Sequence, residues 1–305
     1  MGLDKFFDKD KLRTPEGQRP GHLREPRDII GSGITTPEAE AVEELREPLT
    51  NMVRELKNEL ANGSYDLIIG DDASGRLSTI AIGNIAQSLA KQAHREPPTV
   101  RFLAGSTGIA EREKSLQFEK DRAKTDEEVP KHKKVTRSEK VAAVGDEIAK
   151  MMKTRTRNGF PTKRALIVTD TITTGESMEV FVDALKHHGI PADIATVVQL
   201  DYDDPPDRKE KLDAFLQRWG GKLVVGKYSE ADAPLIWKST HWDEHRDIRN
   251  PSGVQKEMGD VYATPSVGEN EDMRYLRVAR ALTKDMAADI MDEVFPKGEE
   301  QRKAA

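Results

Sequence analysis

The stretch ALIVTDTITTGES, residues 165–177, decides the fold that this sequence predicts. Its first four residues are apolar and partly β-branched, which is typical of a buried strand. Asp170 follows this strand, and a short loop then leads into an expected helix over 178–188. Such a strand–loop–helix unit predicts an anion site, because N–H groups of the loop and of the first helical turn converge on one point.

The side chains of this loop agree with an anion site. The hydroxyls of Thr173, Thr174 and Ser177 add hydrogen-bond donors, and Gly175 lets the backbone approach a phosphate with no Cβ in the way. Asp170 accepts hydrogen bonds and suits a group that offers donors, such as sugar hydroxyls, or a metal bound to them. An ordinary strand-to-helix turn, in which Thr and Ser only cap the helix, is the alternative for this motif taken alone.

The combination resembles the motif with which type I phosphoribosyltransferases bind phosphoribosyl pyrophosphate (PRPP). In that family four apolar strand residues precede two acidic residues, which hold the ribose hydroxyls, and a loop that holds the 5′-phosphate. By this resemblance Asp170 is the second acid, and Thr169 stands in place of the first without its negative charge. The residues that the resemblance assigns to the ribose and the 5′-phosphate are Thr169, Asp170, Thr173, Thr174, Gly175, Glu176 and Ser177.

A second strand–loop–helix unit, residues 66–83 with the sequence DLIIGDDASGRLSTIAIG, precedes the first. In the same family this unit carries the pyrophosphate loop, which the resemblance assigns here to Ala73, Ser74, Gly75 and Arg76. The guanidinium of Arg76 can grip phosphate oxygens in a bidentate manner. Asp71 and Asp72 would repel a bare pyrophosphate, but they could accept a bridging Mg²⁺ through water or turn outward. A capping Asp in a tight turn is the alternative.

Composition limits the classes of function. The 305 residues carry a net charge of −6, so no global basic field favours nucleic acid. Cysteine is absent, which excludes thiolate catalysis and fits a reducing compartment. No apolar run approaches the length of a membrane span. We therefore expect a cytoplasmic protein that binds neither nucleic acid nor membrane.

Strand and helix signals alternate along the chain, which predicts an α/β fold with a parallel sheet flanked by helices, Rossmann-like and similar to type I phosphoribosyltransferases. Strands are expected at 65–70, 99–103, 165–168, 193–200 and 223–226, and helices at 37–60 (interrupted near Pro48), 76–93, 138–156, 178–188, 208–219 and 272–294. Residues 1–33 form an extended arm, which a partner subunit could order in a homodimer, and 34–228 form the α/β domain. Residues 229–305 form an extension with an amphipathic helix, which the resemblance identifies with a hood over the nucleobase.

Two further segments leave alternatives open. The charge-dense residues 104–140 are either a solvated segment or, by the resemblance, a loop that folds over the pyrophosphate. The cation of such a loop would be one of Arg112, Lys114, Lys120, Arg122 and Lys124. In the extension, Trp237 and Trp242 either stack on a base or form a small core. His241 and His245 lack a third ligand, so no metal site formed by the protein alone is expected.

The sequence thus favours PRPP-dependent phosphoribosyl transfer to a nitrogenous base or a related acceptor, with release of pyrophosphate. Asp170 is the expected catalytic carboxylate, and Mg²⁺ is expected to bind mainly through PRPP. The alternative is a non-catalytic regulatory module on the same fold that binds PRPP or a nucleoside monophosphate. Thr169 and the Asp71-Asp72 pair favour this alternative, whereas the phosphate loop and the long charged segment favour the enzyme. Hydrolysis of a nucleotide or phosphosugar by an altered site is a third hypothesis.

Overall fold

The computed structural model describes residues 39, 42–71, 75–105, 136–200, 207–229, 254–255, 264–265 and 271–296. All of them lie within one compact unit, Thr36–Ala305. The predictions for the N-terminal arm, for the cations of the charged segment, and for the tryptophans and histidines of the extension concern residues outside this description.

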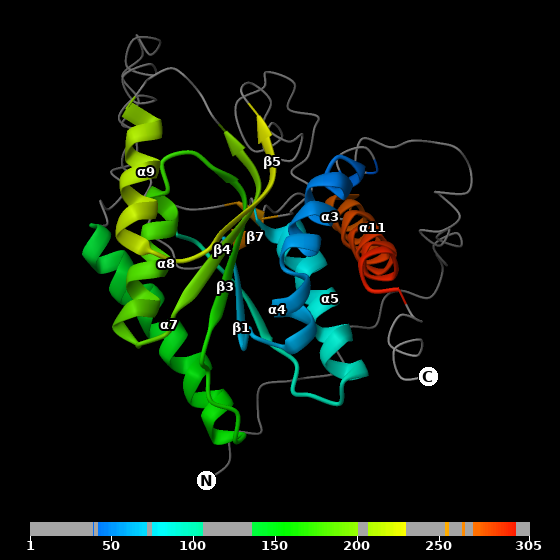
Figure 1. The fold of residues 1–305 in the computed structure, drawn as a ribbon, viewed down its shortest axis with the longest axis horizontal. Coiled ribbons are helices and arrows are strands. Elements are labelled where there is room, and N and C mark those ends of the chain that lie inside the picture. Colours follow the sequence, from blue (N-terminus) through cyan, green and yellow to red (C-terminus); the bar gives the residue numbers. More distant parts are fainter. Residues whose placement is uncertain are drawn as a thin grey trace, which may run out of the picture. The chain divides into compact units, whose positions relative to one another are not determined.

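Five parallel strands form the central sheet, in the spatial order β2-β1-β3-β4-β5 (Figure 1). Their bounds are Leu67–Asp71 for β1, Thr99–Leu103 for β2, Ala165–Ile172 for β3, Ala192–Leu200 for β4 and Leu223–Ser229 for β5. In the register of the sheet, Gly70 of β1 pairs with Val168 of β3, and Thr169 pairs with Thr196 of β4. The predicted α/β fold with a Rossmann-like parallel sheet is confirmed.

Helices cover both faces of the sheet (Figure 1). On one face lie α3 (Arg46–Glu55), α4 (Lys57–Asn62), α5 (Arg76–Gln92) and α11 (Glu271–Val294). On the other face lie α7 (Arg137–Arg157), α8 (Glu176–His187) and α9 (Asp207–Trp219). Because each layer buries its own apolar core, the inner strands are apolar on both sides, as is usual for parallel sheets. A separate two-stranded antiparallel pair joins β6 (Val254–Gln255) to β7 (Thr264–Pro265).

Most element boundaries follow the sequence signals, and two differ. The expected interruption near Pro48 is confirmed, since residues 42–43 are helical, 44–45 form a turn and α3 begins at Arg46, with Pro48 in its first turn; a second break, which was not expected, follows at Leu56. Strand β3 does not stop at residue 168 but continues to Ile172. Thr169 and Asp170 are therefore strand residues, with a backbone fixed by the neighbouring strand β4.

The connections define where the sheet changes direction. From β1 the chain passes through α5 to β2 on one side, whereas β3, α8 and β4 continue on the other side. The adjacent strands β1 and β3 therefore send their following helices to opposite faces. In open α/β sheets this topological switch point, outside the carboxyl ends of the strands, is where ligands bind.

The C-terminal helix α11 belongs to the same layer as α5. Its side chains Ala279, Met286, Ala287, Ile290 and Val294 are buried in the core that α3 and α5 share. An ion pair from Arg46 to Asp289 (3.2 Å) and another from Arg54 to Glu293 fasten it to α3. Its predicted role in a hood over a nucleobase stays a prediction. None of the described helices has the length and apolar character needed to cross a membrane.

Candidate functional site at the carboxyl ends of β1 and β3

The loop after β1 and the strand β3 touch at Gly75. A Cβ atom on Gly75 would lie 2.7 Å from the carbonyl oxygen of Val168 and 3.0 Å from Cα of Thr169. Any side chain at this position would therefore push the loop away from the strand. Glycine thus brings the start of α5 against the motif strand, and the two units singled out in the sequence are neighbours in space.

Two helices begin at this end of the sheet with glycine as the N-cap residue. Gly75 precedes α5 and Gly175 precedes α8, and neither cap forms a side-chain hydrogen bond. Helix α7 begins differently, with a capping box in which Thr136 accepts from the Glu139 N–H and its own N–H donates to the Glu139 carboxylate (2.8 Å). The glycine caps themselves offer no side-chain acceptor to the first-turn N–H groups of α5 and α8, which suits these groups to bind an anion.

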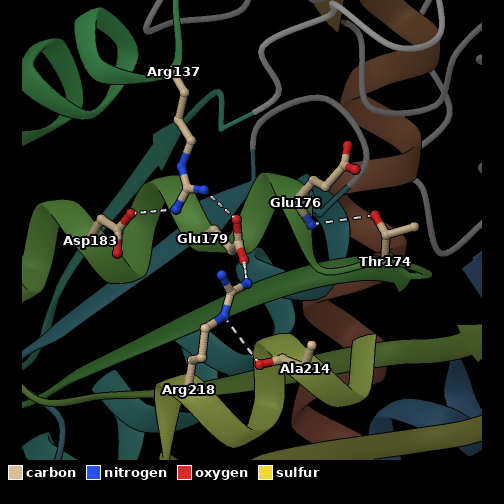
Figure 2. A network of polar contacts seen from close by, with 7 residues as sticks. All are labelled: Arg137, Thr174, Glu176, Glu179, Asp183, Ala214 and Arg218. Carbon is tan, nitrogen blue, oxygen red and sulfur yellow. Dashed lines mark hydrogen bonds and ion pairs between the residues drawn. The ribbon is translucent and has the colours of Figure 1, made fainter. Parts of the chain in front are cut away.

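The motif loop lies at the start of α8. Thr173, Thr174 and Ser177 are partly buried, and Glu176 is exposed. The Glu176 N–H donates to Oγ1 of Thr174 (3.4 Å), while the Glu176 carboxylate points away from the ion pair between Arg137 and Glu179 (Figure 2). Glu176 therefore contributes to the loop through its backbone, as expected of a residue in an anion-binding turn.

Gly175 has a structural role in addition to the one that the sequence suggests. Its φ angle of +78° lies in the left-handed region that favours glycine. A Cβ here would come within 2.5 Å of the Phe215 ring on α9. The missing side chain makes room for the core between α8 and α9, and the positive φ shapes the loop; the approach of a phosphate to this glycine stays a prediction.

Thr169 and Asp170, the positions assigned to the ribose, lie inside β3 and are 1% and 2% exposed. Since side chains alternate along a strand, they point to opposite faces of the sheet. Thr169 faces the layer of α7 and α8, and Asp170 faces the layer of α5, as their neighbours in the two cores show. The Thr169 hydroxyl donates to the carbonyl of Thr171 (3.4 Å). The Thr169 hydroxyl also lies 3.5 Å from Oδ1 of Asp170, so the structure brings both side chains together at one end of the sheet.

Asp71 ends β1 and turns inward. It is 4% exposed, and its Oδ1 accepts a hydrogen bond from the N–H of Gly105, in the loop after β2 (3.2 Å). A Cβ on Gly105 would lie 2.7 Å from the carbonyl oxygen of Ser177, so this loop also adjoins the start of α8. Asp72, Ala73 and Ser74, which complete the predicted pyrophosphate loop and its acidic pair, lie outside the described residues.

Arg76, the cation predicted for the pyrophosphate, lies at the first position of α5. Its guanidinium carbon is 4.6 Å from the centre of the Phe102 ring on β2, a cation–π distance. The ring therefore holds the guanidinium beside the start of α5, where a helix N-terminus already favours negative charge.

An ion-pair network fixes the first two turns of α8 (Figure 2). Arg137 on α7 contacts Glu179 (2.6 Å) and Asp183 (2.5 Å), and Arg218 on α9 contacts Glu179 from the other side. The side chain of Glu179 is only 12% exposed. These residues escaped the sequence reasoning, because only the packing of three separate helices brings them together, and no local pattern signals it.

A groove of about 550 Å³ runs along α8 and α9. The rings of Phe215 and Trp219 stack in its wall with centres 5.7 Å apart. Pro191 and Gly221, which precede β4 and β5, also line it, so it extends toward the amino ends of these strands. The ligand position expected in an open α/β sheet is the opposite end, and we therefore take the crevice at β1 and β3 as the candidate site.

No group of three or more His, Cys, Asp and Glu side chains suited to a metal ion occurs in the described part of the chain.

A scan of the sequence against protein-family models finds no match, and a search among curated proteins finds none either. Any function of this protein is therefore inferred from the geometry at the carboxyl ends of β1 and β3 and from the motif residues there.

Proposed function

We propose that the protein binds PRPP in the crevice between β1 and β3 and transfers its phosphoribosyl group to a nitrogenous base or related acceptor. One observation carries this proposal: two glycine-capped helix N-termini start from neighbouring strands at the switch point. PRPP carries two separate anionic groups, a 5′-phosphate and a pyrophosphate, and each requires a site of this kind.

The two anion sites differ in their side chains, which supports an assignment of each group. Residues 173–177 supply hydroxyls and backbone N–H groups, as suits the 5′-phosphate. The loop 73–76 ends in the guanidinium of Arg76, held at the start of α5 by the Phe102 ring, as suits the more highly charged pyrophosphate. The ligand would then lie across the switch point, with its ribose near the end of β3.

Asp170 is the residue that we assign to the ribose. Its carboxylate would accept hydrogen bonds from the ribose hydroxyls and balance the positive charge that develops on the sugar when the bond from C1′ to the pyrophosphate breaks. Mg²⁺ would be bound mainly by the phosphate oxygens of PRPP, and it would shield the charge of the pyrophosphate leaving group. The chain has no cysteine, which fits the reducing cytoplasm in which we place this activity.

A second candidate function is a regulatory module that binds PRPP or a nucleoside monophosphate without turnover. Two observations favour it: Thr169 stands where the family has its first acid, and both Thr169 and Asp170 are almost fully buried. A site with one buried carboxylate stabilises a cationic sugar less well than a site with two accessible ones.

Two measurements separate these functions. Calorimetry with PRPP tests binding, and a ligand at a hundredfold excess over Kd should also raise the free energy of unfolding by about 3 kcal/mol. Release of pyrophosphate on addition of PRPP, Mg²⁺ and a pool of nucleobases would establish the transferase. Binding without release would establish the regulatory module. Neither heat nor a melting shift with PRPP, ribose 5-phosphate or any mononucleotide would overturn both.

A further inference from the structure

The groove along α8 and α9 offers room for a ligand outside the crevice at β1 and β3. Its volume of about 550 Å³ is typical of sites for small organic molecules. Helix α8 lines it with residues at helical spacing, Glu179, Val182, Asp183 and Lys186, and so presents one face to it. The wall on this side is therefore a regular helix, on which apolar and charged side chains adjoin.

The wall formed by α9 is aromatic. The rings of Phe215 and Trp219 are stacked, with centres 5.7 Å apart and planes inclined by 4°. Phe215 is only 2% exposed, whereas Trp219 is partly exposed, so the aromatic surface that a ligand can reach belongs mainly to Trp219. Gly221 makes room for this indole, because a Cβ atom there would lie 2.3 Å from two of its ring carbons. A flat aromatic ligand would extend the stack.

The charged side chains of the groove carry one more positive than negative charge. Its cations are Arg137, Lys186 and Arg218, and its acids are Glu179 and Asp183. Both acids are engaged, Glu179 by the two arginines and Asp183 by Arg137 (Figure 2). Lys186 is exposed and forms no ion pair with any described residue. The groove therefore favours an anion, and Lys186 is the cation that remains for it.

The aromatic wall also reaches the motif loop. A Cβ atom on Gly175 would come within 2.5 Å of the Phe215 ring, so this ring packs directly against the N-cap of α8. Gly175 belongs to the loop 173–177, which we assign to the 5′-phosphate. A ligand that restrains the stack of Phe215 and Trp219 would therefore restrain this loop as well.

We propose that the groove is a second ligand site, which binds a small aromatic anion with its ring against Trp219 and its negative charge beside Lys186, and that its occupancy strengthens PRPP binding through Phe215 and Gly175. The second part rests on the proposed function, whereas the first does not. Since the groove extends toward the amino ends of β4 and β5, its ligand does not compete with PRPP for the crevice.

Calorimetry with three related compounds tests the site on the full chain. Naphthalene-2-carboxylate has both the aromatic ring and the negative charge, 2-naphthylmethylammonium has the opposite charge, and decahydronaphthalene-2-carboxylate lacks the aromatic ring. We expect the first to bind with a Kd below about 1 mM, and each of the others to bind weaker by about fivefold or more. No binding of the first compound, or equal affinity of the first and either of the others, would overturn the proposal.

Two variants test whether the compound lies in the groove. Trp219→Leu removes the stacking surface and should weaken naphthalene-2-carboxylate about tenfold, whereas Lys186→Gln removes the remaining cation and should weaken it about threefold. Lys153→Gln, at an exposed position of α7 outside the groove, is the matched control and should bind like wild type. Melting curves check that each variant is folded, and the exposed Lys186 keeps the test decisive if Trp219→Leu does not fold. Unchanged affinity in either folded variant would overturn the assignment of the groove.

A titration with PRPP tests the effect on the motif loop. With naphthalene-2-carboxylate at saturation, PRPP should bind about threefold more tightly, and saturating PRPP should strengthen the binding of naphthalene-2-carboxylate by the same factor. Unchanged or mutually weakened affinities would overturn the second part of the proposal. If wild type bound no PRPP, the proposed function and this second part would fail together, while the titration with the three compounds would still decide the first part.

Discussion

The two ends of the parallel sheet hold their buried acids in different ways. At the amino end, Asp193 is 2% exposed and accepts hydrogen bonds from the Tyr65 hydroxyl (2.7 Å), the Arg164 guanidinium (2.6 Å) and the N–H of Lys222 (3.3 Å). These donors immediately precede or lie near the starts of β1, β3 and β5, respectively. One carboxylate of β4 thus connects the segments that precede three other strands.

A second acid at the amino end has the same character. Asp66 accepts from the N–H of Lys163 (2.7 Å) and from Arg155 (3.4 Å), which also donates to the carbonyl of Pro97 (3.2 Å). The donors are fixed parts of loops and helices. This end of the sheet is held together by hydrogen bonds between protein groups.

The carboxyl end gathers a different set of groups. Asp71 and Asp170 are buried there, near the starts of two glycine-capped helices. Gly75 brings the start of α5 against β3, and Gly105 brings the loop after β2 against the start of α8. The acids at the amino end thus stabilise the fold, whereas those at the carboxyl end lie where α/β sheets bind ligands. Substitutions at the two ends should therefore separate stability from binding.

The largest expected effect is at the amino end. Asp193→Ala leaves the Tyr65 hydroxyl and the Arg164 guanidinium without their acceptor, and we expect the free energy of unfolding to fall by about 4 kcal/mol. Urea unfolding measures it, with Asp213→Ala on the exposed side of α9 as the matched control. PRPP affinity of the folded variant should stay within twofold of wild type. A loss below about 1 kcal/mol would show that this end is not the stabilising one.

Gly175 should give the next largest effect. Gly175→Ala must adopt a φ of +78° and also push against Phe215, and together these should cost about 3 kcal/mol. Gly189→Ala is a matched control, because Gly189 ends the same helix with a φ of +68° and has no atom within 4 Å of an added Cβ. Strain alone should cost that variant about 1 kcal/mol. Equal losses in urea unfolding would remove Phe215 from the explanation.

Asp170, an acid at the carboxyl end of the sheet, should affect turnover rather than stability. If the protein is a transferase, Asp170→Asn keeps the shape of the side chain and loses the charge that a cationic transition state needs. We expect roughly a hundredfold lower kcat, equivalent to about 2.7 kcal/mol, with a smaller change in PRPP affinity. Asp183→Asn on the outer side of α8, with a side chain that is 40% exposed, is the control. Undiminished pyrophosphate release would remove Asp170 from the mechanism.

Much of the fold could be predicted from the sequence, because short apolar runs between Gly and Pro breakers signal strands clearly. Strand β2 at 99–103 and helix α5 at 76–92 match the expected limits within one residue. The end of β3 could not be predicted, since Thr171 and Ile172 extend the strand by pairing with β4, a partner distant in sequence. Local propensity says nothing about such a partner.

The candidate site was less accessible to sequence reasoning. The resemblance pointed to the loop 173–177 and the acid Asp170, but it could not show that Thr169 and Asp170 are 1% and 2% exposed inside β3. It also explained Gly175 by an approaching phosphate, whereas the contact with Phe215 depends on how α9 packs.

A pH titration of stability sharpens the description of the amino end. Burial, together with the hydrogen bond to Asp193, raises the pKa of Tyr65 above its usual value. The folded protein keeps this proton where the unfolded chain loses it, so the contribution is complete below about pH 10 and falls above it by about 1.4 kcal/mol per pH unit. Urea unfolding between pH 9 and pH 11 should show a steeper decline for wild type than for Tyr65→Phe. Tyr228→Phe, at a side chain that is 68% exposed, should keep the decline of wild type.

The smallest expected effect concerns the ion pairs on the outer side of α8. Arg137 is 48% exposed, so its contacts with Glu179 and Asp183 compete with water, and Arg137→Met should cost about 0.5 kcal/mol in urea unfolding. Arg218→Met should cost a similar amount, and half a molar salt should reduce both losses. The double variant should lose more than the sum, because the mostly buried Glu179 then keeps neither arginine partner. PRPP affinity should stay within twofold in all three variants; a clear loss of affinity at unchanged stability would assign Arg137 to the ligand and extend the functional end of the sheet to this surface.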